Sequence, residues 1–349
     1  MKLKNKTVLV TGGTGSLGQK FVERVLSGEM GLPKKIIVFS RDESKQHDMR
    51  IKWMNTNKQS DNLIFNNFKR LLEFRIGDIR NYDDIFAAAK NADVIINAAA
   101  LKHVPVCEYF PEQAILTNCM GAINLVKCIN NHNLKVNTVV GISTDKASSP
   151  INVMGMSKAI QERIMIASNI FSKKTRIMNV RYGNVIASRG SVLPLFAHQI
   201  KSQHNLTITD RKMTRFLLNL DQAVDTIFFA IKHGRHGDTI VPKAPSCKVE
   251  DIAKVLLSNK KYKRKIEVIG IRPGEKIHEV MVTNEEARGC YQIKNYFRIQ
   301  SMLPELDTGN HGKRIKAEYS SEFPLLNINE VKTLLIKNKI IDTNCNILI

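Results

Sequence analysis

The stretch VLVTGGTGSLG, residues 8–18, limits the possible fold more than any other part of the sequence. An apolar, β-branched run leads into a glycine-rich turn and then a helical pattern, so that Gly12, Gly15 and Gly18 have G-x-x-G-x-x-G spacing. In such a turn, the first glycine permits a tight bend, the second lets a diphosphate approach the backbone, and the third lets helix and strand pack closely. The anion then faces the N-terminus of the helix. The stretch predicts a dinucleotide-binding turn whose contacts are Gly12, Thr14, Gly15, Ser16, Leu17 and Gly18.

Short apolar runs alternate with helical patterns through the first half of the chain. The strand candidates are apolar on both faces and are separated by helices, which is typical of a parallel sheet covered on both sides. We therefore expect an α/β fold with a Rossmann-type doubly wound parallel sheet. The expected strands are KTVLVTGG, KKIIVFS, LEFRIGD, DVIINAAAL and NTVVGIST, and the expected helices are SLGQKFVERVLSG, DDIFAAAKN and QAILTNCMGAINLVKCINN.

The 349 residues are enough for roughly two domains. We expect residues 1–187 to form the Rossmann domain, completed by about 218–246, where DQAVDTIFFAIKHG predicts a returning helix and DTIVPKA predicts one more strand. Residues 188–217 and 247–349 then form a smaller α/β substrate lobe and a C-terminal tail with one amphipathic segment, NINEVKTLLIKN. The lobe is interleaved with the first domain.

The net charge is strongly positive, with 53 Lys and Arg against 32 Asp and Glu, or +21. Such a field attracts polyanions. However, the basic residues are dispersed, and no aromatic residues interleave with them to form a stacking platform for nucleic acid. We therefore expect anionic small molecules as partners, rather than a dedicated nucleic-acid site.

Other classes of protein are disfavoured by the composition. The six cysteines form no C-x-x-C pair and have no histidines at metal-ligand spacing, so no metal site is predicted. No apolar run approaches the ~20 residues that a membrane helix requires. The N-terminal segment lacks the apolar core of a signal peptide, and we expect a cytoplasmic protein.

The end of the second expected strand selects the cofactor. An acidic residue there would bind the ribose 2′-hydroxyl of NAD. The sequence instead supplies Ser40 and Arg41, with Lys45 one turn later, and these groups suit a 2′-phosphate. Although Asp42 follows directly, the pattern favours NADP over NAD.

Two further segments are expected beside the cofactor. Asp78 and Ile79 follow the third strand and would border the adenine. Ala98, Ala99 and Ala100 follow the fourth strand, and they are small enough to let the nicotinamide half lie against the sheet.

The segment STDKASSPINVMGMSK, residues 143–158, follows the fifth expected strand. Thr144, Asp145 and Lys146 therefore fall at the carboxyl end of that strand, beside the cofactor crevice. They are candidate catalytic groups, because a carboxyl and an amine there can exchange protons with a bound substrate.

A helix is expected to follow, with Pro150 and Asn152 at its approach. Met154 and Lys158 are four residues apart on this helix and share one face. Lys158 can hydrogen-bond the nicotinamide ribose and lower nearby proton affinities by its charge. The side chain of Met154 is a thioether, which neither gives nor takes a proton.

Several motifs together resemble the extended short-chain dehydrogenase/reductases. More narrowly, they resemble the bacterial UDP-N-acetylglucosamine 4,6-dehydratases of the soluble, C5-inverting type. The match runs from residue 5 to about 290, and the T-D-K triplet marks that branch. Related enzymes carry a tyrosine four residues before the lysine, where this chain has Met154. The capsule-type members of the branch also have methionine there. Besides the glycine triplet, the motifs are SRDESK, AALKHVPVCEYFPEQAILTNCMGAINL, STDKASSPINVMGMSKAIQE, RYGNV, KMTRFLLNLDQAVD and IRPGEKIHEVMV.

The resemblance implies oxidation at C4 of the sugar by NADP+, loss of water across C5 and C6, and return of the hydride to C6. Asp145 would be the acid toward the leaving C6 hydroxyl, and Lys146 the base at C5. A lysine of ordinary pKa, ~10.4, is a poor base at neutral pH, so we expect burial and the charge of Lys158 to lower the pKa of Lys146. Reprotonation of C5 from the opposite face would give the L-arabino 4-keto product.

Met154 need not mean an inactive enzyme. The missing tyrosine would collect the O4 proton, and general-base help of this kind is worth ~10²–10⁴ in rate. Thr144, a water held by Lys158, or Lys146 itself can take over that task, and the sequence leaves these three open.

The resemblance also implies contacts with the sugar and the diphosphate. Lys102 and His103 would lie near the hexose, although a lone histidine is often structural. Asn184 and Arg272 would contact the diphosphate, because a guanidinium reaches two phosphate oxygens at once.

On the uridine side, Thr214 and Arg215 would line the pocket. Glu275, with Lys276, belongs to the same RPGEK turn as the phosphate-binding arginine and either borders the substrate or holds the turn. Ordinary surface salt bridges are the competing interpretation for the arginines.

Two other functions stay open. A 4-epimerase acting on UDP-N-acetylglucosamine needs oxidation and reduction at C4 but no acid–base pair for C5 and C6, so T-D-K disfavours it. A non-catalytic NADP-binding regulator with a basic surface for nucleic acid is favoured only by Met154. The resemblance further implies UDP-N-acetylglucosamine as substrate and a homo-oligomer, often a hexamer.

Overall fold

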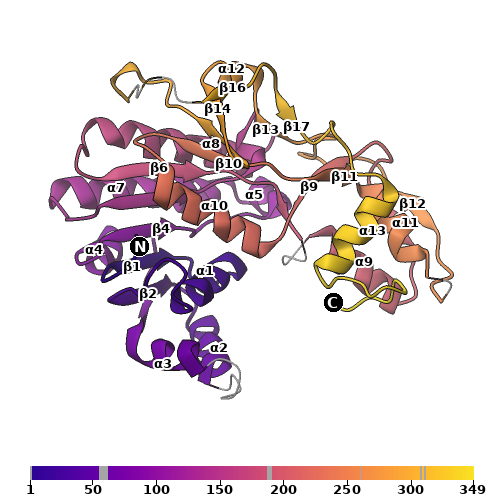
Figure 1. Cartoon of the computed structure of the whole chain (residues 1–349), viewed down its shortest axis with the longest axis horizontal. Coiled ribbons are helices and arrows are strands. Elements are labelled where there is room, and N and C mark those ends of the chain that lie inside the picture. The colour runs from indigo at the N-terminus through magenta and orange to yellow at the C-terminus, as the bar shows by residue number, and fades with distance from the viewer. Residues whose placement is uncertain (1, 55–61, 187–190, 260, 307–308, 310–311) are drawn as a thin grey trace.

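The computed structural model describes residues 2–54, 62–186, 191–259, 261–306, 309 and 312–349. Within these ranges, one large sheet has seven adjacent parallel strands, from β3 to β10, and three antiparallel strands at one edge (Figure 1). The order across the sheet is β16 (Lys313–Arg314), β14 (Cys290–Ile293), β15 (Tyr296–Ile299), β10 (Thr239–Pro242), β6 (Arg176–Val180), β5 (Thr138–Ile142), β4 (Val94–Asn97), β1 (Thr7–Thr11), β2 (Lys35–Ser40) and β3 (Leu72–Ile76). The expected Rossmann-type doubly wound sheet is confirmed.

Helices cover both faces of this sheet. The set on one face is α1 (Ser16–Leu26), α2 (Glu43–Met54), α3 (Asn62–Leu71) and α10 (Leu220–His233), and the set on the other is α4 (Tyr82–Ala89), α7 (Gly121–Asn131) and α8 (Val153–Ala167). Because side chains alternate along a strand, Val8 and Val10 of β1 pack in the first core while Leu9 packs in the second. This double burial explains why the middle positions of β1 are apolar on both faces of the sheet.

A helical stretch connects β4 to the second layer. It consists of α5 (Val104–Tyr109), α6 (Pro111–Ala114), the π-helical η1 (Ile115–Met120) and α7. It contains the helix expected from QAILTNCMGAINLVKCINN, with a π-helical middle.

The chain returns to the first domain through α10 and β10. Asn219 and Gln222 form a reciprocal capping box at the start of α10, and α10 then packs against α1. β10 pairs with β6 in parallel. Both elements expected from the sequence are confirmed.

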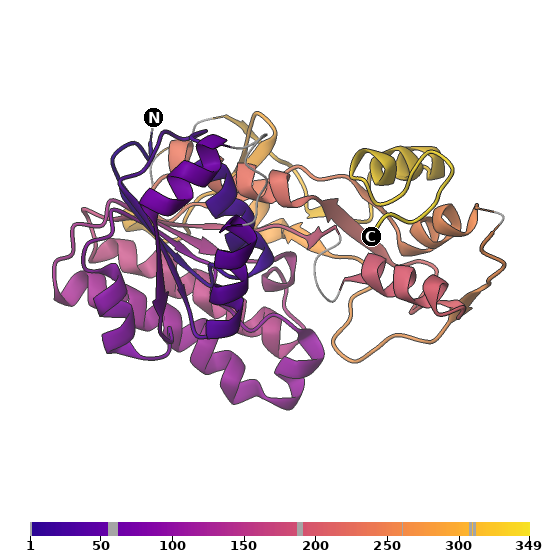
Figure 2. The ribbon, with the colours of Figure 1, turned by 90° about the horizontal axis from the view of Figure 1, so that it is seen from below.

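A smaller lobe lies beside the Rossmann domain and has its own apolar core (Figure 2). Its main elements are α9 (Val192–Lys201), β8 (Leu206–Ile208), α11 (Val249–Leu257), β12 (Ile266–Val268) and α13 (Ile328–Lys337). Two small sheets join it to the first domain, and their strands are β7 (Asn184–Val185), β9 (Thr214–Leu218) and β11 (Ser246–Lys248), then β13 (Val280–Val282) and β17 (Tyr319–Ser320). The short helix α12 (Asn284–Ala287) follows β13.

The structure divides the C-terminal segment differently from the expected boundaries. Residues 290–314, grouped with the lobe by sequence, supply the antiparallel strands β14, β15 and β16 of the main sheet. β15 pairs with β10, so these strands cover an edge that would otherwise be open. The expected boundary at 187/188 lies outside the described residues. No helix in the described ranges has the length and apolarity needed to cross a membrane.

Candidate functional site

The crevice of the sheet opens between β1 and β4, where the strand order reverses direction. Thr11, the last residue of β1, donates a hydrogen bond from Oγ1 to Asn97 Oδ1 at 2.8 Å and accepts one from the backbone N–H of Ala99 at 3.2 Å. These bonds hold the carboxyl ends of the two strands side by side. In open α/β sheets, this switch point is where dinucleotides bind.

The glycine turn leaves no room for side chains at its contact points. Gly12 has φ +64°, and a Cβ there would lie 2.8 Å from the carbonyl carbon and oxygen of Ala98. A Cβ on Gly18 would lie 2.6 Å from Gly13 Cα. Gly15 is the exposed N-cap residue of α1 and carries no side chain to fill that helix terminus, so the first amides of α1 suit an external anion. Thr14 is buried in the turn, Ser16 is exposed and Leu17 packs against the core.

The end of β2 presents its basic side chains with acidic neighbours. Arg41 is half-exposed, and its Nη1 lies 3.6 Å from Asp78 Oδ2. Lys45 Nζ lies 2.5 Å from Asp42 Oδ2. Ser40 Oγ accepts a hydrogen bond from Gln46. Asp78 thus pairs with one of these basic groups and Asp42 with the other.

The borders of the crevice are small or apolar. Ile79 is buried against Gly121, and Ala98, Ala99 and the exposed Ala100 form the turn after β4.

The segment STDKASSPINVMGMSK, residues 143–158, leaves β5 through a tight turn. Ser143 N–H donates to Val180 O at 2.7 Å, and Asp145 N–H donates to Tyr182 O at 3.1 Å, so the segment continues along β6. Thr144 then caps the 3-10 helix η2 (Asp145–Ala147). A Cβ on Gly155, in the first turn of α8, would overlap the carbonyl oxygen of Lys146. The GMSK sequence therefore permits α8 to pack directly on η2.

The expected start of α8 is confirmed. Asn152 is its N-cap residue and accepts a hydrogen bond from Gly155 N–H at 2.8 Å. On this helix, Met154 and Lys158 are both buried, at 5% exposure each. Met154 packs with Cys107 and Ala114, so its position presents an apolar surface with no group that titrates.

Four charged side chains meet at the carboxyl end of β5, and we call Asp145, Lys146, Arg215 and Glu279 the charged cluster. Lys146 Nζ lies 3.1 Å from Asp145 Oδ1 and 3.1 Å from Glu279 Oε1. Arg215 Nε lies 3.7 Å from the same Glu279 oxygen. Thr144 Oγ1 donates to Asp145 Oδ1 at 2.9 Å. The side chain of Asp145 is fully buried, whereas that of Lys146 is 19% exposed.

The cluster shifts its own proton equilibria. Burial raises the pKa of Asp145, and the charge of Glu279 raises it further, although Lys146 opposes both. Burial alone would lower the pKa of Lys146, but the carboxylates of Asp145 and Glu279 outweigh it and the pKa is raised. The expectation that Lys146 has a lowered pKa is therefore wrong, because two anions contact its amine.

The lysine with the lowered pKa is Lys158. Burial lowers the pKa of Lys158 to about 8. Its Nζ donates to the carbonyl oxygen of Ile142 and, at 2.7 Å, to Gln161 Oε1. Both acceptors are neutral, so nothing in direct contact compensates an ammonium charge there.

Several buried polar atoms around η2 have no hydrogen-bond partner among the described residues. They are Ser143 Oγ, Asp145 Oδ2, Ser148 Oγ, Asn184 Oδ1 and Glu279 Oε2. Buried polar atoms without partners are rare in folded proteins and each requires an explanation. Their concentration here indicates a place where a polar ligand or water completes the structure.

The RPGEK turn lies against the catalytic segment. Asn152 Nδ2 donates to Gly274 O at 2.8 Å, and Lys276 Nζ donates to Ser148 O at 2.8 Å. Arg272 is exposed on this turn, and Glu275 N–H donates to Arg272 O at 3.1 Å. Gly274 and Lys276 therefore tie the turn that carries Arg272 to residues 148–152.

The remaining expected contacts are more scattered. Lys102 and His103 are exposed in the loop after β4, and Asn184 begins β7. Thr214 is buried, and its hydroxyl is engaged with His278 Nδ1 at 2.8 Å and Ser321 Oγ at 2.7 Å.

Arg215 lies on β9 with its side chain 11% exposed. Its Nη1 donates to Thr214 O at 2.7 Å and Ile277 O at 3.2 Å, which directs its Nε toward Glu279.

Two residues of this region, Asn118 and Glu279, were not predicted from the sequence. Asn118 in η1 accepts from Leu101 N–H at 2.9 Å and donates to Ser157 Oγ at 2.9 Å, which fixes the loop after β4 to α8. The sequence feature that could have revealed Asn118 is its position as a polar residue inside the apolar helical run AILTNCMGA. Glu279 has no comparable signal, because an acidic residue beside a short strand is ordinarily exposed.

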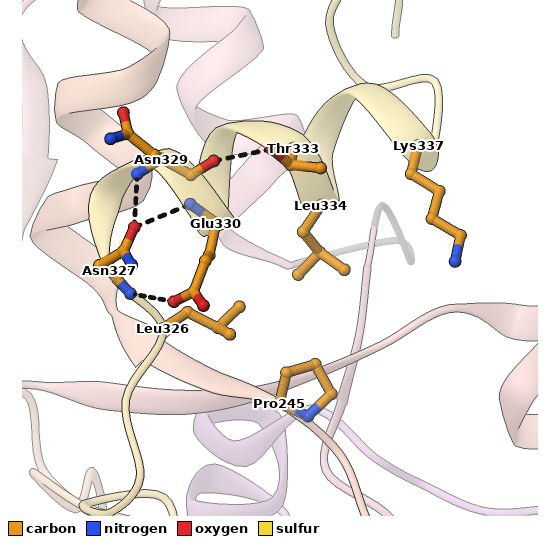
Figure 3. A pocket seen from close by; sticks show the side chains of 8 residues that line it. All are labelled: Pro245, Leu326, Asn327, Asn329, Glu330, Thr333, Leu334 and Lys337. Atoms are coloured by element: carbon orange, nitrogen blue, oxygen red, sulfur yellow. Dashed lines mark hydrogen bonds between the residues drawn. The ribbon is translucent and has the colours of Figure 1, made fainter.

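A hollow of about 400 Å³ lies elsewhere, between α13 and Pro245 (Figure 3). Its polar lining is mostly engaged within α13: Asn327 Oδ1 accepts from the N–H groups of Asn329 and Glu330, and Thr333 donates to Asn329 O. None of the candidate site residues lines it. Among the described residues, no group of three or more His, Cys, Asp and Glu side chains is placed to hold a metal ion.

The switch point of the sheet and the glycine cradle define a Rossmann-type dinucleotide-binding fold. More particularly, the chain belongs to the family described as polysaccharide biosynthesis protein, whose model matches residues 8–301.

Relatives and solved structures agree with this membership. Proteins named UDP-glucose 4-epimerase from Rickettsia bellii (strain OSU 85-389) and Rickettsia prowazekii (strain Madrid E) are 42% and 43% identical over 342 residues, covering 95% of this chain and 96% of theirs. The structure of Pen from Bacillus thuringiensis has a TM-score of 0.85 at 35% identity, covering 96% of this chain and 98% of that one. The dTDP-glucose 4,6-dehydratase DesIV from Streptomyces venezuelae, at 20% identity and a TM-score of 0.64, covers 78% of this chain and 86% of its own and shares the fold.

Proposed function

We propose that the chain is a UDP-N-acetylglucosamine 4,6-dehydratase of the C5-inverting type, making UDP-2-acetamido-2,6-dideoxy-β-L-arabino-hex-4-ulose for surface polysaccharide. The observation that carries this proposal is a buried carboxyl with a raised pKa, Asp145, in contact with the amine of Lys146 at the carboxyl end of β5. Loss of water across two adjacent carbons needs an acid and a base side by side. Oxidation and reduction at C4 alone need an acceptor for the O4 proton but no acid–base pair for C5 and C6.

The crevice fits a dinucleotide cofactor. Gly12 provides a cradle that a Cβ would fill, and the first amides of α1 face it. Arg41 and Lys45 at the end of β2 support NADP over NAD as the resident cofactor. When bound, such a cofactor supplies the acceptor for the C4 hydride and the donor for its return to C6. The nucleotide extracted from purified protein, identified by mass spectrometry, tests this preference.

Asp145 is the proposed acid toward the C6 hydroxyl. Its raised pKa favours the protonated form that an acid needs. Its Oδ2 lies toward Gly183, has no hydrogen-bond partner in the part of the chain that the structure describes, and is closed off from solvent. Direct proton transfer therefore requires that substrate binding open this packing, so that the leaving hydroxyl meets Oδ2.

Lys146 is the proposed base at C5, and it must first lose a proton because its pKa is raised. Met154 supplies no acceptor for the O4 proton. Thr144, Lys146 and a water held by Lys158 stay the candidates. Burial lowers the pKa of Lys158 to about 8, which is closer to neutrality than the raised pKa of Lys146.

The substrate contacts follow the same proposal. Arg272, held on the turn that docks against Ser148 and Asn152, would bind the diphosphate with Asn184. Lys102 and His103 would border the hexose.

On the uridine side we propose Thr214 and Arg215, with Glu275 supporting the turn. We further propose that the enzyme is a homo-oligomer, which its mass by light scattering tests.

One NMR assay tests the reaction. The protein is incubated with UDP-N-acetylglucosamine in D₂O, and the products are followed by ¹H and ¹³C spectra. The proposal expects loss of the C6 hydroxyl, a 4-keto sugar and deuterium at C5. Recovery of unchanged substrate, or a product that retains the C6 hydroxyl, would overturn it.

A 4-epimerase is the second candidate, and the names of the Rickettsia relatives favour it. It predicts UDP-N-acetylgalactosamine, or UDP-galactose when UDP-glucose is supplied, with C6 intact and no deuterium at C5. The same spectra with both substrates distinguish the two reactions.

A further inference from the structure

Glu279 lies directly before β13, one strand of the small β13–β17 sheet. It is 1% exposed, and one of its oxygens contacts Lys146 at 3.1 Å and Arg215 at 3.7 Å. Its other oxygen is buried with no partner among the described residues. A carboxylate in such a place is costly unless it serves the groups that it faces.

The backbone of Glu279 is fixed on both sides by one serine. Glu279 N–H donates to Ser321 Oγ at 2.9 Å, and Ser321 N–H donates to Glu279 O at 2.7 Å. Ser321 Oγ also pairs with Thr214 Oγ1 at 2.7 Å. Residues from three distant parts of the chain thus hold this carboxylate against Lys146.

The charged groups that face Glu279 come from each element packed around it. Lys146 belongs to η2, Arg215 to β9 and Lys276 to the RPGEK turn, while Asp145 shares the amine of Lys146 with Glu279. Burial would raise the pKa of Glu279, but these cations outweigh burial and its pKa is lowered. Of the two carboxyls on Lys146, Glu279 is therefore shifted toward its ionised form and Asp145 toward its protonated form.

We propose that Glu279 is a positioning residue of the active site: it anchors the Lys146 amine and holds a negative charge that favours the protonated form of Asp145. This inference rests on the proposed acid and base roles of those two residues. A simple structural ion pair would hold the two side chains together without affecting the proton equilibrium of Asp145.

The first experiment is the pH profile of kcat/KM for dehydration, measured for wild type and Glu279→Gln. Removing an anion lowers the proton affinity of both neighbours, so both limbs of the bell are expected to move to lower pH by about one unit. The maximum is expected to fall about tenfold, because the amine loses one of its two anchors. Glu279→Asp keeps the charge, so its bell should stay in place at reduced height.

The matched control is Glu322→Gln, which removes a half-exposed carboxylate 3.9 Å from His278, outside the cluster. Its profile should equal that of wild type. A Glu279→Gln enzyme that loses activity equally at every pH, with both limbs unmoved, would overturn the inference, because a purely structural pair behaves in that way.

A second readout does not depend on the reaction. Acetic anhydride acetylates only neutral amines, so the pH dependence of acetylation at Lys146, followed by peptide mass spectrometry of the full-length protein, reports its titration. Lys146 should titrate at lower pH in Glu279→Gln than in wild type, and an unchanged titration overturns the inference. If this shift occurs while wild type dehydrates no UDP-sugar, the proposed function fails and the role of Glu279 stands.

Arg215→Met covers the case in which Glu279→Gln does not fold. The substitution removes a cation that lowers the proton affinity of Lys146 and leaves the Glu279 anion less neutralised. Lys146 should then titrate at higher pH than in wild type. A shift to lower pH, or none, contradicts the proposed coupling within the cluster.

Discussion

The cofactor turn and the charged cluster are built in opposite ways. At the turn, a continuous stretch of backbone makes the site, and Gly12 and Gly18 matter because a Cβ would collide with neighbouring backbone. At the cluster, side chains make the site, and Lys146 is held by the carboxylate of Glu279, which is remote in sequence. The first region is encoded locally, whereas the second exists only after distant parts of the chain have packed together.

The two regions should therefore fail differently when they are changed. A substitution in the turn should weaken cofactor binding and stability together, because the same backbone serves both. A substitution in the cluster should reduce turnover and leave the cofactor bound. The substitutions below are ordered from the largest expected effect to the smallest.

Lys146→Ala should have the largest effect. It removes the proposed C5 base, and general-base catalysis is worth ~10²–10⁴ in rate. We expect dehydration to be abolished within the limits of the NMR assay while NADP is retained. Lys127→Ala, an exposed lysine on α7, is the control and should be fully active. Turnover that matches wild type would remove the assignment of Lys146 as the base.

Arg181→Met tests how strongly the stability of the region behind the charged cluster depends on its side-chain ion pairs. Arg181 is 2% exposed and bridges Glu162 of α8, at 2.6 Å, to Glu286 of α12, at 2.8 Å. Leaving two buried carboxylates unpaired should cost about 3–5 kcal/mol in the free energy of unfolding, measured with urea. Lys35→Met, which breaks an exposed pair with Glu73, should cost less than about 1 kcal/mol. Equal losses in the two variants would mean that burial does not set the strength of these pairs.

Gly12→Ala is the matching test of the turn. The new Cβ would lie 2.8 Å from backbone atoms of Ala98, and an L-residue at φ +64° is strained. Strain and overpacking together should cost about 2–4 kcal/mol in stability. The fraction of purified protein that retains NADP should fall with it. Gly289→Ala, where a Cβ meets nothing within 4 Å, should change neither quantity. Full NADP retention in Gly12→Ala would contradict a backbone-built cradle.

The same division explains what could be predicted from the sequence. The glycine turn, the parallel sheet and the returning helix α10 follow from local periodicity and composition, and the structure confirms them. The hairpin β14–β15 could not be assigned to the main sheet, because its strands are short and pair with β10, which is remote in sequence. The carboxylates of Asp145 and Glu279 together reversed the expected pKa shift of Lys146, and the sequence gives no sign of the long-range contact with Glu279.

Lys158 gives the smallest and most specific test, because it lies on α8 between the two regions. Burial lowers its pKa in the folded protein to about 8, from 10.5 in the unfolded chain. Between these values the unfolded chain binds more protons than the folded one, so the free energy of unfolding must rise with pH. The penalty of the buried ammonium is fully present below pH 8 and is relieved as the pH rises through that value.

For one such group, the rise between pH 7 and pH 9 is about 1 kcal/mol. Lys158→Met lacks the titrating amine, so urea unfolding of wild type and variant, both free of cofactor, should differ by this amount more at pH 7 than at pH 9, in favour of the variant. If the difference between them does not change with pH, the amine titrates normally in the fold. Water would then solvate the Lys158 amine as it does that of a surface lysine. The contacts of this amine with Ile142 and Gln161 would not exclude water from the space between the glycine turn and the charged cluster.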